Sequence, residues 1–227
     1  MPTKPLHTVV DDFDAIATAL AALGGADRLS RAEQQLLDEI PPTARTGLDA
    51  GCGHGVLTRA AATRGVAMLG VDVSPHMVAL ARGNSGPAST VRYEVVDIMS
   101  SNLDGATFDV VMSVNVVHHL PIAAVIQQLA GFVRPGGRLL VQDVLNRPGI
   151  RYFAVNAAAA LSRTYTRLRD RDFARGSVAR LYESHGEGET YLEPSMLQRT
   201  YATLLPGARI IHHLEWRYSV LWDRPAS

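Results

Sequence analysis

Residues 48–55 (LDAGCGHG) carry the clearest chemical signature in the chain. A short apolar run reaches Asp49 and then enters glycines at alternate positions, Gly51, Gly53 and Gly55, before a helical pattern begins. Glycine permits a tight turn and lets a bulky ligand lie against the main chain. Dinucleotide folds use G-x-G-x-x-G, whereas the spacing here is G-x-G-x-G. With Asp49 before it, this variant points away from pyrophosphate and toward S-adenosylmethionine, although a lone triplet also fits an ordinary strand-to-helix turn.

Two further carboxylates end apolar runs downstream of the glycines. Asp72 follows Asp49 by 23 residues. In a doubly wound sheet, an acidic residue about 20 residues past the glycine loop binds the ribose hydroxyls. Asp97 ends the next run and suits an adenine amino group, with Ile98 in apolar contact with the ring. The alternatives are a turn at Asp97 and a helix N-cap at Asp72, although Ser74 would serve that cap better.

His118 and His119 follow the fourth apolar run, close to where a methyl group should be presented. Either imidazole could act as a general base, because histidine titrates near neutrality. A strand end should aim only one of two consecutive side chains into the cleft, so His118 fits a positional role better and His119 is the preferred base. A structural role in the loop is the alternative for both, since methyl transfer needs in-line positioning more than acid–base help.

Residues 183–191 are polar and hinged by glycines, so they could form a lid that brings His185 and Tyr191 to a substrate. A solvated loop is the alternative. The arginines between 163 and 180 fit a solvated helix face better than a phosphate site. No residue is assigned as a metal ligand.

The elements around these residues alternate between strands and helices, which predicts a parallel sheet with helices on both faces. Helices are expected at 11–23, with acids in its first turn, and at 31–40, where Ser30 and Glu33 form a capping box. Residues 97–107 should form little more than a turn, and residues 147–196 a helical insertion. The expected strands are 46–50, 67–72, 91–96, 108–114 and, after a turn at 134–137, 138–144, and the helices between them are 54–64, 75–83 and 121–133.

The series LDAGCGHG, VDVS, VDIM, FDVVMSVNVVHHL and VRPGGRLLVQD resembles the class I S-adenosylmethionine-dependent methyltransferases in order and spacing, over roughly residues 44–144. The tail is similar to a bacterial, small-molecule subgroup. The resemblance implies an α/β, Rossmann-like fold with a seven-stranded, mostly parallel sheet. Segments 208–216 and 218–222 would be its last two strands, the final one antiparallel. Residues 1–43 and 147–196 would then be a cap and a substrate lid on a single domain, 1–227.

The same resemblance implies the roles of the cofactor-binding residues. Asp49 would orient the methionine amino group, and Cys52 would be a small residue beneath the methionine. Met77 would lean on the adenine, with core packing as its alternative, and Asn115 would end strand four. The predicted cofactor-binding residues are Asp49, Ala50, Gly51, Cys52, Gly53, Gly55, Asp72, Val73, Met77, Asp97, Ile98, Asn115 and Val116.

Composition narrows the partners of the chain. It has 22 basic and 22 acidic residues, so its formal net charge is zero, whereas nucleic-acid binders are usually basic. The single cysteine, Cys52, excludes a disulfide within the chain and favours a reducing cytoplasm. No apolar run reaches the roughly 18 residues of a membrane span, and no signal layout is apparent. The expected partner is therefore a small-molecule substrate, without nucleic acid or membrane, and the oligomeric state stays open.

Three functions compete on this evidence. The leading one is methyl transfer from S-adenosylmethionine to a small molecule or natural-product intermediate. A cofactor-binding protein without methyl transfer, either a scaffold or a non-methylating enzyme, is the main alternative. An NAD-dependent oxidoreductase is disfavoured, because the glycine spacing differs and Lys4, the only lysine, leaves no Tyr-x-x-x-Lys pair.

Overall fold

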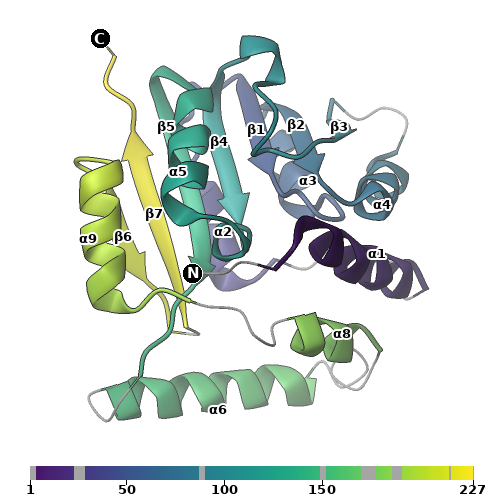
Figure 1. Ribbon diagram of the computed structural model, residues 1–227, viewed down its shortest axis with the longest axis vertical. Coiled ribbons are helices and arrows are strands. Elements are labelled where there is room, and N and C mark those ends of the chain that lie inside the picture. The colour runs from purple at the N-terminus through teal and green to yellow at the C-terminus, as the bar shows by residue number, and fades with distance from the viewer. Residues whose placement is uncertain are drawn as a thin grey trace.

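The computed structural model describes residues 4–22, 29–86, 90–148, 152–169, 177–185, 191–214 and 216–226. Its strands are β1 (Thr46–Ala50), β2 (Ala67–Asp72), β3 (Arg92–Val95), β4 (Phe108–Val114), β5 (Val133–Val144), β6 (Arg209–His212) and β7 (Arg217–Asp223). They form one seven-stranded sheet in the order β3-β2-β1-β4-β5-β7-β6 (Figure 1). The first five strands are parallel, and β7 is antiparallel to both its neighbours. This confirms the expected Rossmann-like fold with its antiparallel last strand.

Helices cover both faces of the sheet. One face carries α2 (Arg31–Asp38), α3 (Val56–Ala62) and α4 (Pro75–Ser85), and the other carries α5 (Ile122–Phe132) and α9 (Pro194–Leu204). Successive strand residues point to opposite faces. Accordingly, Val111 of β4 packs on the α5 side, whereas Val110 and Met112 pack on the α2 side.

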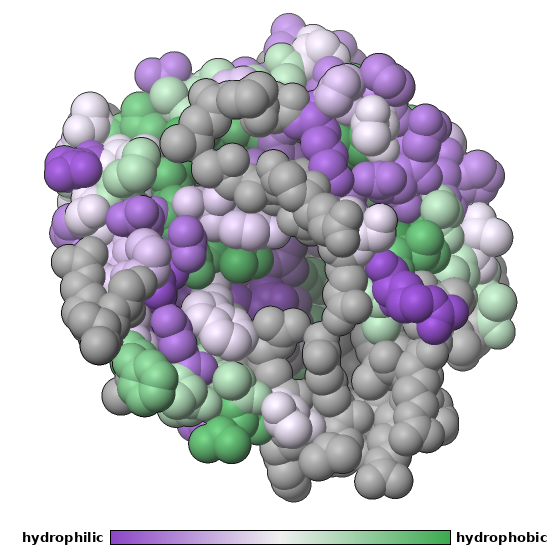
Figure 2. Space-filling model, turned by 60° about the horizontal axis from the view of Figure 1, so that its bottom comes forward, coloured by the Kyte–Doolittle hydropathy of each residue, from purple (hydrophilic) through white to green (hydrophobic). Residues whose placement is uncertain are grey.

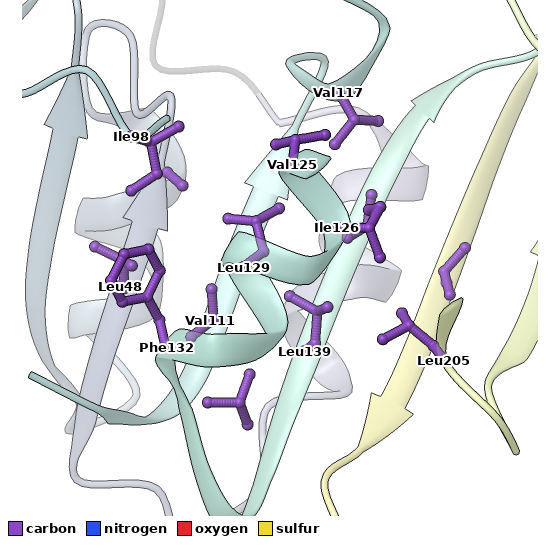
Figure 3. Close-up of a cluster of buried hydrophobic side chains, with 14 of the residues drawn as sticks. Leu48, Ile98, Val111, Val117, Val125, Ile126, Leu129, Phe132, Leu139 and Leu205 are labelled. Atoms are coloured by element: carbon purple, nitrogen blue, oxygen red, sulfur yellow. The ribbon is translucent and has the colours of Figure 1, made fainter. Parts of the chain in front are cut away.

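The largest apolar cluster lies between α5 and the sheet (Figure 3). Leu129 on α5 meets Leu48, Val111 and Leu139 from three neighbouring strands, and all four are fully buried. Burying one such side chain stabilises the fold by about 1.5–3 kcal/mol. The strand ends that carry the polar candidates are therefore held by a rigid core.

One of the two helix starts near the N-terminus follows the sequence, and the other does not. Ser30 accepts a hydrogen bond from the Glu33 backbone, and the Glu33 carboxylate accepts one from Ser30, so the capping box is confirmed. Helix α1 (Leu6–Ala22) begins five residues earlier than expected, because Val9 already belongs to its buried face and Pro5 accepts its first hydrogen bond. The expectation of acids in the first turn is therefore wrong.

The turn expected at 134–137 is also wrong, because β5 begins at Val133. Gly136 and Gly137 exchange backbone hydrogen bonds with Arg224 beyond β7, and Arg134 pairs with Asp109. The residues at 134–137 instead lie where the register between β4 and β5 shifts.

Two short segments complete the comparison with the sequence. Residues 97–107 contain only a 3₁₀ turn, η1 (Leu103–Gly105), as expected. Strand β6 is shorter than the predicted 208–216, because it ends at His212, and Trp216, just before β7, adopts a left-handed φ of 52°.

Three helices lie beyond the carboxyl ends of the parallel strands: α1, α6 (Phe153–Arg169) and α8 (Ser177–His185) (Figure 1). The predicted insertion at 147–196 thus contains α6, α8 and the first residues of α9, which already belongs to the sheet cover. Among the helices of the described residues, none is long and apolar enough to cross a membrane.

Candidate active site at the carboxyl edge of the sheet

The glycine loop turns sharply from β1 into α3. Gly51 has a φ of 77°, and a Cβ there would meet Val116 at 2.2 Å, so two separate constraints demand glycine. Gly55 is left-handed as well and caps α3. A Cβ on Gly53 would meet no atom within 4 Å among the described residues. The loop therefore exposes its main chain at Gly53, as the approach of a large ligand requires.

Asp49 lies fully buried under this loop and accepts a hydrogen bond of 2.6 Å from the Thr58 hydroxyl. Burial raises the pKa of its carboxyl to about 6; the hydrogen bond opposes this shift, and the charge of Asp72 adds to it. A cation placed beside Asp49 would favour the charged carboxylate. The site thus suits an ammonium group.

Asp72 ends β2, and two backbone amides aim its carboxylate. Its oxygens accept hydrogen bonds from Gly53, at 2.8 Å, and from Ser74, at 2.9 Å. Burial raises the pKa of Asp72, and the backbone hydrogen bonds oppose the shift. Ser74 rather than Asp72 caps α4, by accepting from Met77 at 3.0 Å. Asp72 and the adjacent Val73 therefore face the glycine loop, and the carboxylate can accept further hydrogen bonds.

Three residues were expected around an adenine, and Met77 lies in a different environment from Asp97 and Ile98. Asp97 is half-buried and accepts a hydrogen bond from the Met99 backbone at 2.9 Å, while Ile98 is buried in the main core cluster. Met77 is fully buried in a cluster with Ile16 of α1 and Val178 of α8. The structure therefore shows Met77 in a packing role, and an adenine contact stays a prediction.

Asn115 and Val116 form a sharp corner after β4. Asn115 has a φ of 59°, a left-handed conformation that asparagine adopts more readily than other non-glycine residues. Its side-chain oxygen accepts a hydrogen bond of 2.6 Å from Arg217 of β7. The corner brings Val116 against Gly51 and sends the chain into the 3₁₀ turn η2 (Val117–His119).

His118 is held by a carboxylate that sequence reasoning missed. Its Nδ1 lies 2.5 Å from Oδ1 of Asp143, and the His118 backbone amide donates to Oδ2 at 2.9 Å. Asp143 is fully buried near the carboxyl end of β5, next to β4 in the sheet. The place of Asp143 at a strand end, like that of Asp72, is the signal that could have identified it.

His119 occupies a different environment. It is buried, and its Nε2 lies 3.4 Å from Nε2 of His185 on α8. Burial, together with the charges of His118 and His185, lowers the pKa of His119 to about 2. The Nδ1 of His185 in turn lies 2.8 Å from Asp12 of α1. His119 is consequently neutral at physiological pH.

The cap places aromatic rings around these histidines. Phe13 of α1 stands 4.6 Å from the His185 ring and 5.8 Å from the His119 ring, and Tyr191 stands 5.2 Å from the His118 ring. The structure thus brings both predicted substrate residues, His185 and Tyr191, to the predicted catalytic pair. Seen from the cap side, the surface is hollowed near its centre, with hydrophilic and hydrophobic residues together in its depth (Figure 2).

The arrangement fits S-adenosylmethionine on three observations: the open main chain at Gly53, the buried carboxylate of Asp49 and the aimed carboxylate of Asp72. Among the described residues, no group of three or more side chains could hold a metal ion. Fold and site together define the class I methyltransferase architecture.

Comparison with known proteins bears this out. Residues 48–141 match the family described as "Methyltransferase domain", and this likeness supports S-adenosylmethionine as the cofactor. The chain is 35% identical over 118 residues to a ubiquinone biosynthesis O-methyltransferase of Pseudomonas paraeruginosa, covering 50% of each protein. It is 38% identical over 109 residues to a 2-methyl-6-phytyl-1,4-hydroquinone methyltransferase of Synechocystis, covering 47% of this chain and 34% of that one. It thus spans half or less of the length of these relatives.

Solved structures share the fold across nearly the whole chain. Magnesium protoporphyrin IX methyltransferase from Synechocystis, with bound S-adenosylmethionine, aligns with a TM-score of 0.61 at 15% identity, covering 98% of this chain and all of that one. The [4+2]-cyclase SpnF aligns with a TM-score of 0.69 at 15% identity, covering 100% and 99%. At such identities the likeness concerns the fold alone, and a cyclase among the neighbours shows that this fold does not determine the reaction.

Proposed function

We propose that the protein transfers a methyl group from S-adenosylmethionine to a protonated oxygen of a small molecule, with His118 as the general base. The observation that carries the proposal is the fixed contact between His118 and the buried Asp143 at the carboxyl edge of the sheet. The curated relatives support it, since their names describe O-methylation and methylation of a hydroquinone.

The chain's own residues would hold the cofactor as follows. Asp49 would accept hydrogen bonds from the ammonium group, Asp72 would bind the ribose hydroxyls, and Asp97 with Ile98 would contact the adenine. When bound, S-adenosylmethionine supplies a methyl group on a positively charged sulfur, which keeps the electron pair of the broken bond. Each residue therefore orients a part of the ligand remote from the methyl group, and such positioning lowers the barrier to transfer.

The geometry favours His118 over His119 as the base. With its Nδ1–H donated to Asp143, the neutral His118 ring presents a lone pair on Nε2. That atom would accept the acceptor's proton as oxygen attacks the methyl group, and Asp143 would stabilise the imidazolium that forms. His119, whose pKa is lowered to about 2, retains a proton too weakly for this task.

The cap would exclude water and orient the acceptor. Residues 1–43 and 147–196 supply α1 and α8, which bring Phe13 and His185 against His119, and Tyr191 follows them. A small acceptor is part of this proposal. Independence from nucleic acid and membrane, and a cytoplasmic location, stay expectations that rest on charge balance and on the single cysteine, Cys52.

The test has two stages. Calorimetry should show binding of S-adenosylhomocysteine and not of NAD. A panel of phenols, hydroxybenzoates and small carboxylates, incubated with S-adenosylmethionine, should yield S-adenosylhomocysteine and a product heavier by one methylene for at least one member. That reaction should fail in His118→Ala and persist in His212→Ala, a control on an exposed histidine of β6. Tight cofactor binding with transfer unaffected by His118→Ala would overturn the assignment of the base, and NAD binding would overturn the function.

A further inference from the structure

Helix α1 packs against α4, which follows the ribose carboxylate Asp72, and against α8, which carries His185. Its buried residues Ile16 and Leu20 share one apolar cluster with Met77 of α4 and Val178 of α8. The strands β3, β4 and β5 lie between α4 and α8 in the chain, so α1 joins two parts of the chain that are distant in sequence. Two acids of α1, Asp12 and Asp14, reach in these two directions.

Asp14 reaches the cofactor side. Its Oδ1 accepts a short hydrogen bond from the Ser74 hydroxyl, and its Oδ2 lies 2.8 Å from His76 Nδ1. Ser74 is fully buried, and its backbone amide donates to Asp72. Asp14 is therefore connected through Ser74 to Asp72, the carboxylate assigned to the ribose.

Asp12 reaches the acceptor side. Its Oδ2 lies 2.8 Å from His185 Nδ1 and 3.4 Å from Lys4 Nζ, and Lys4 also donates to the His185 carbonyl. His185 in turn meets His119. Consecutive helix residues are about 100° apart around the axis, so Asp12 and Asp14 leave α1 on nearly opposite sides. One rigid helix thus carries a contact to each half of the site.

We propose that Asp12 and Asp14 are positioning residues, through which cofactor binding at Asp72 sets the placement of His185 in the acceptor site. The roles of Asp72 and His185 rest on the proposed function. A ribose held by Asp72 restrains Ser74, Ser74 restrains Asp14, and α1 then holds α8 through Asp12 and the shared apolar cluster. Ligand binding that orders one end of a packed element favours order at its other end.

Amide hydrogen exchange tests the link without knowledge of the acceptor, with S-adenosylhomocysteine as the probe. In the wild-type protein, saturating probe should slow exchange in residues 177–185 by about three- to tenfold, the range that one ordinary intramolecular hydrogen bond supplies. Asp14→Asn should abolish this response in 177–185 and weaken probe affinity by about threefold to tenfold. Asp12→Asn should speed exchange there with and without probe, while probe affinity stays unchanged.

The matched control is Asp11→Asn, which removes the same charge from an exposed position of α1. It should behave as wild type in both measurements. A wild-type protein that binds the probe without any change in 177–185, or an Asp14→Asn variant that matches Asp11→Asn, would overturn the link. A protein that shows the link yet methylates nothing would instead overturn the proposed function, so the two failures are distinguishable.

Discussion

Two carboxylate–imidazole pairs each place a ring beside His119, and they differ in how they are built. The core pair, Asp143 and His118, belongs to β5 and to the turn after β4, and its carboxylate is fully buried. The cap pair, Asp12 and His185, joins two helices, and its carboxylate side chain is one-third exposed. The core pair is therefore held within the sheet, whereas the cap pair depends on the packing of two helices nearer the surface.

Hydrogen bonding sharpens this contrast. Asp143 accepts hydrogen bonds from the His118 ring and from the His118 backbone. It also accepts one from the backbone of Val144 at 2.7 Å, so three hydrogen bonds fix the orientation of its carboxylate. Asp12 has only side-chain partners in its described contacts, His185 and Lys4. Precise catalytic geometry depends on such locked supporting residues. On this contrast rests our proposal that the core pair removes the proton and the cap pair selects the acceptor.

The largest effect is expected from breaking the core pair. Replacement of His118 by Ala should lower the rate of methyl transfer by about 10²–10⁴-fold, the usual contribution of a general base, while affinity for S-adenosylhomocysteine stays unchanged. Initial rates and calorimetry on the same variant would check both statements. A loss below about tenfold would reduce His118 to a positional role.

A smaller effect, on cofactor affinity, is expected from replacing Asp72 in the cofactor site. Asp72→Ala removes a charged hydrogen-bond acceptor, which contributes about 1.5–3 kcal/mol, so affinity for S-adenosylhomocysteine should fall roughly ten- to a hundredfold. The fold should persist, because Asp72 stands at a strand end, and circular dichroism would confirm it. Unchanged affinity would show that Asp72 only shapes the loop.

The pH dependence of cofactor affinity should report on Asp49, which belongs to neither histidine pair. The carboxyl of Asp49 has its pKa raised to about 6, and only its charged form attracts an ammonium group. Affinity should therefore be constant above pH 6 and fall by up to about tenfold per pH unit below it. Calorimetry at pH 7.5 and pH 5 would measure this, and Asp49→Asn should bind weakly at both. A wild-type affinity that does not change between these two pH values would contradict the role.

The smallest effect on rate is expected from the cap pair. His185→Gln should raise the KM for an acceptor and lower kcat by less than about tenfold, because a positional contact, unlike a general base, is only partly lost on conservative replacement. A loss of kcat as large as that of His118→Ala would show that the cap pair also performs chemistry.

The sequence predicted the features of the core better than the contacts of the cap. The succession of strands and helices along the chain, the capping box at Ser30 and the gathering of Asp49, Asp72 and His118 at one edge were predicted from the sequence pattern. The preference for His119 over His118 had no such basis, because the choice depends on Asp143 and His185, which only the tertiary fold brings to the two rings. Local patterns carry no information on contacts between α1 and α8, which are 173 residues apart at Asp12 and His185.

Imidazole nitrogen NMR of the ¹⁵N-histidine-labelled protein with S-adenosylhomocysteine is the most direct test of the central claim, that Asp143 prepares His118 as the base. The resonances can be assigned by single replacements of His118, His119 and His185. The account predicts that His118 carries its proton on Nδ1 and that this preference weakens in Asp143→Asn but not in Asp12→Asn. It further predicts that His119 stays neutral throughout the pH range in which the protein is folded. A His118 ring protonated on Nε2, or a His119 that titrates near pH 6.5, would contradict it.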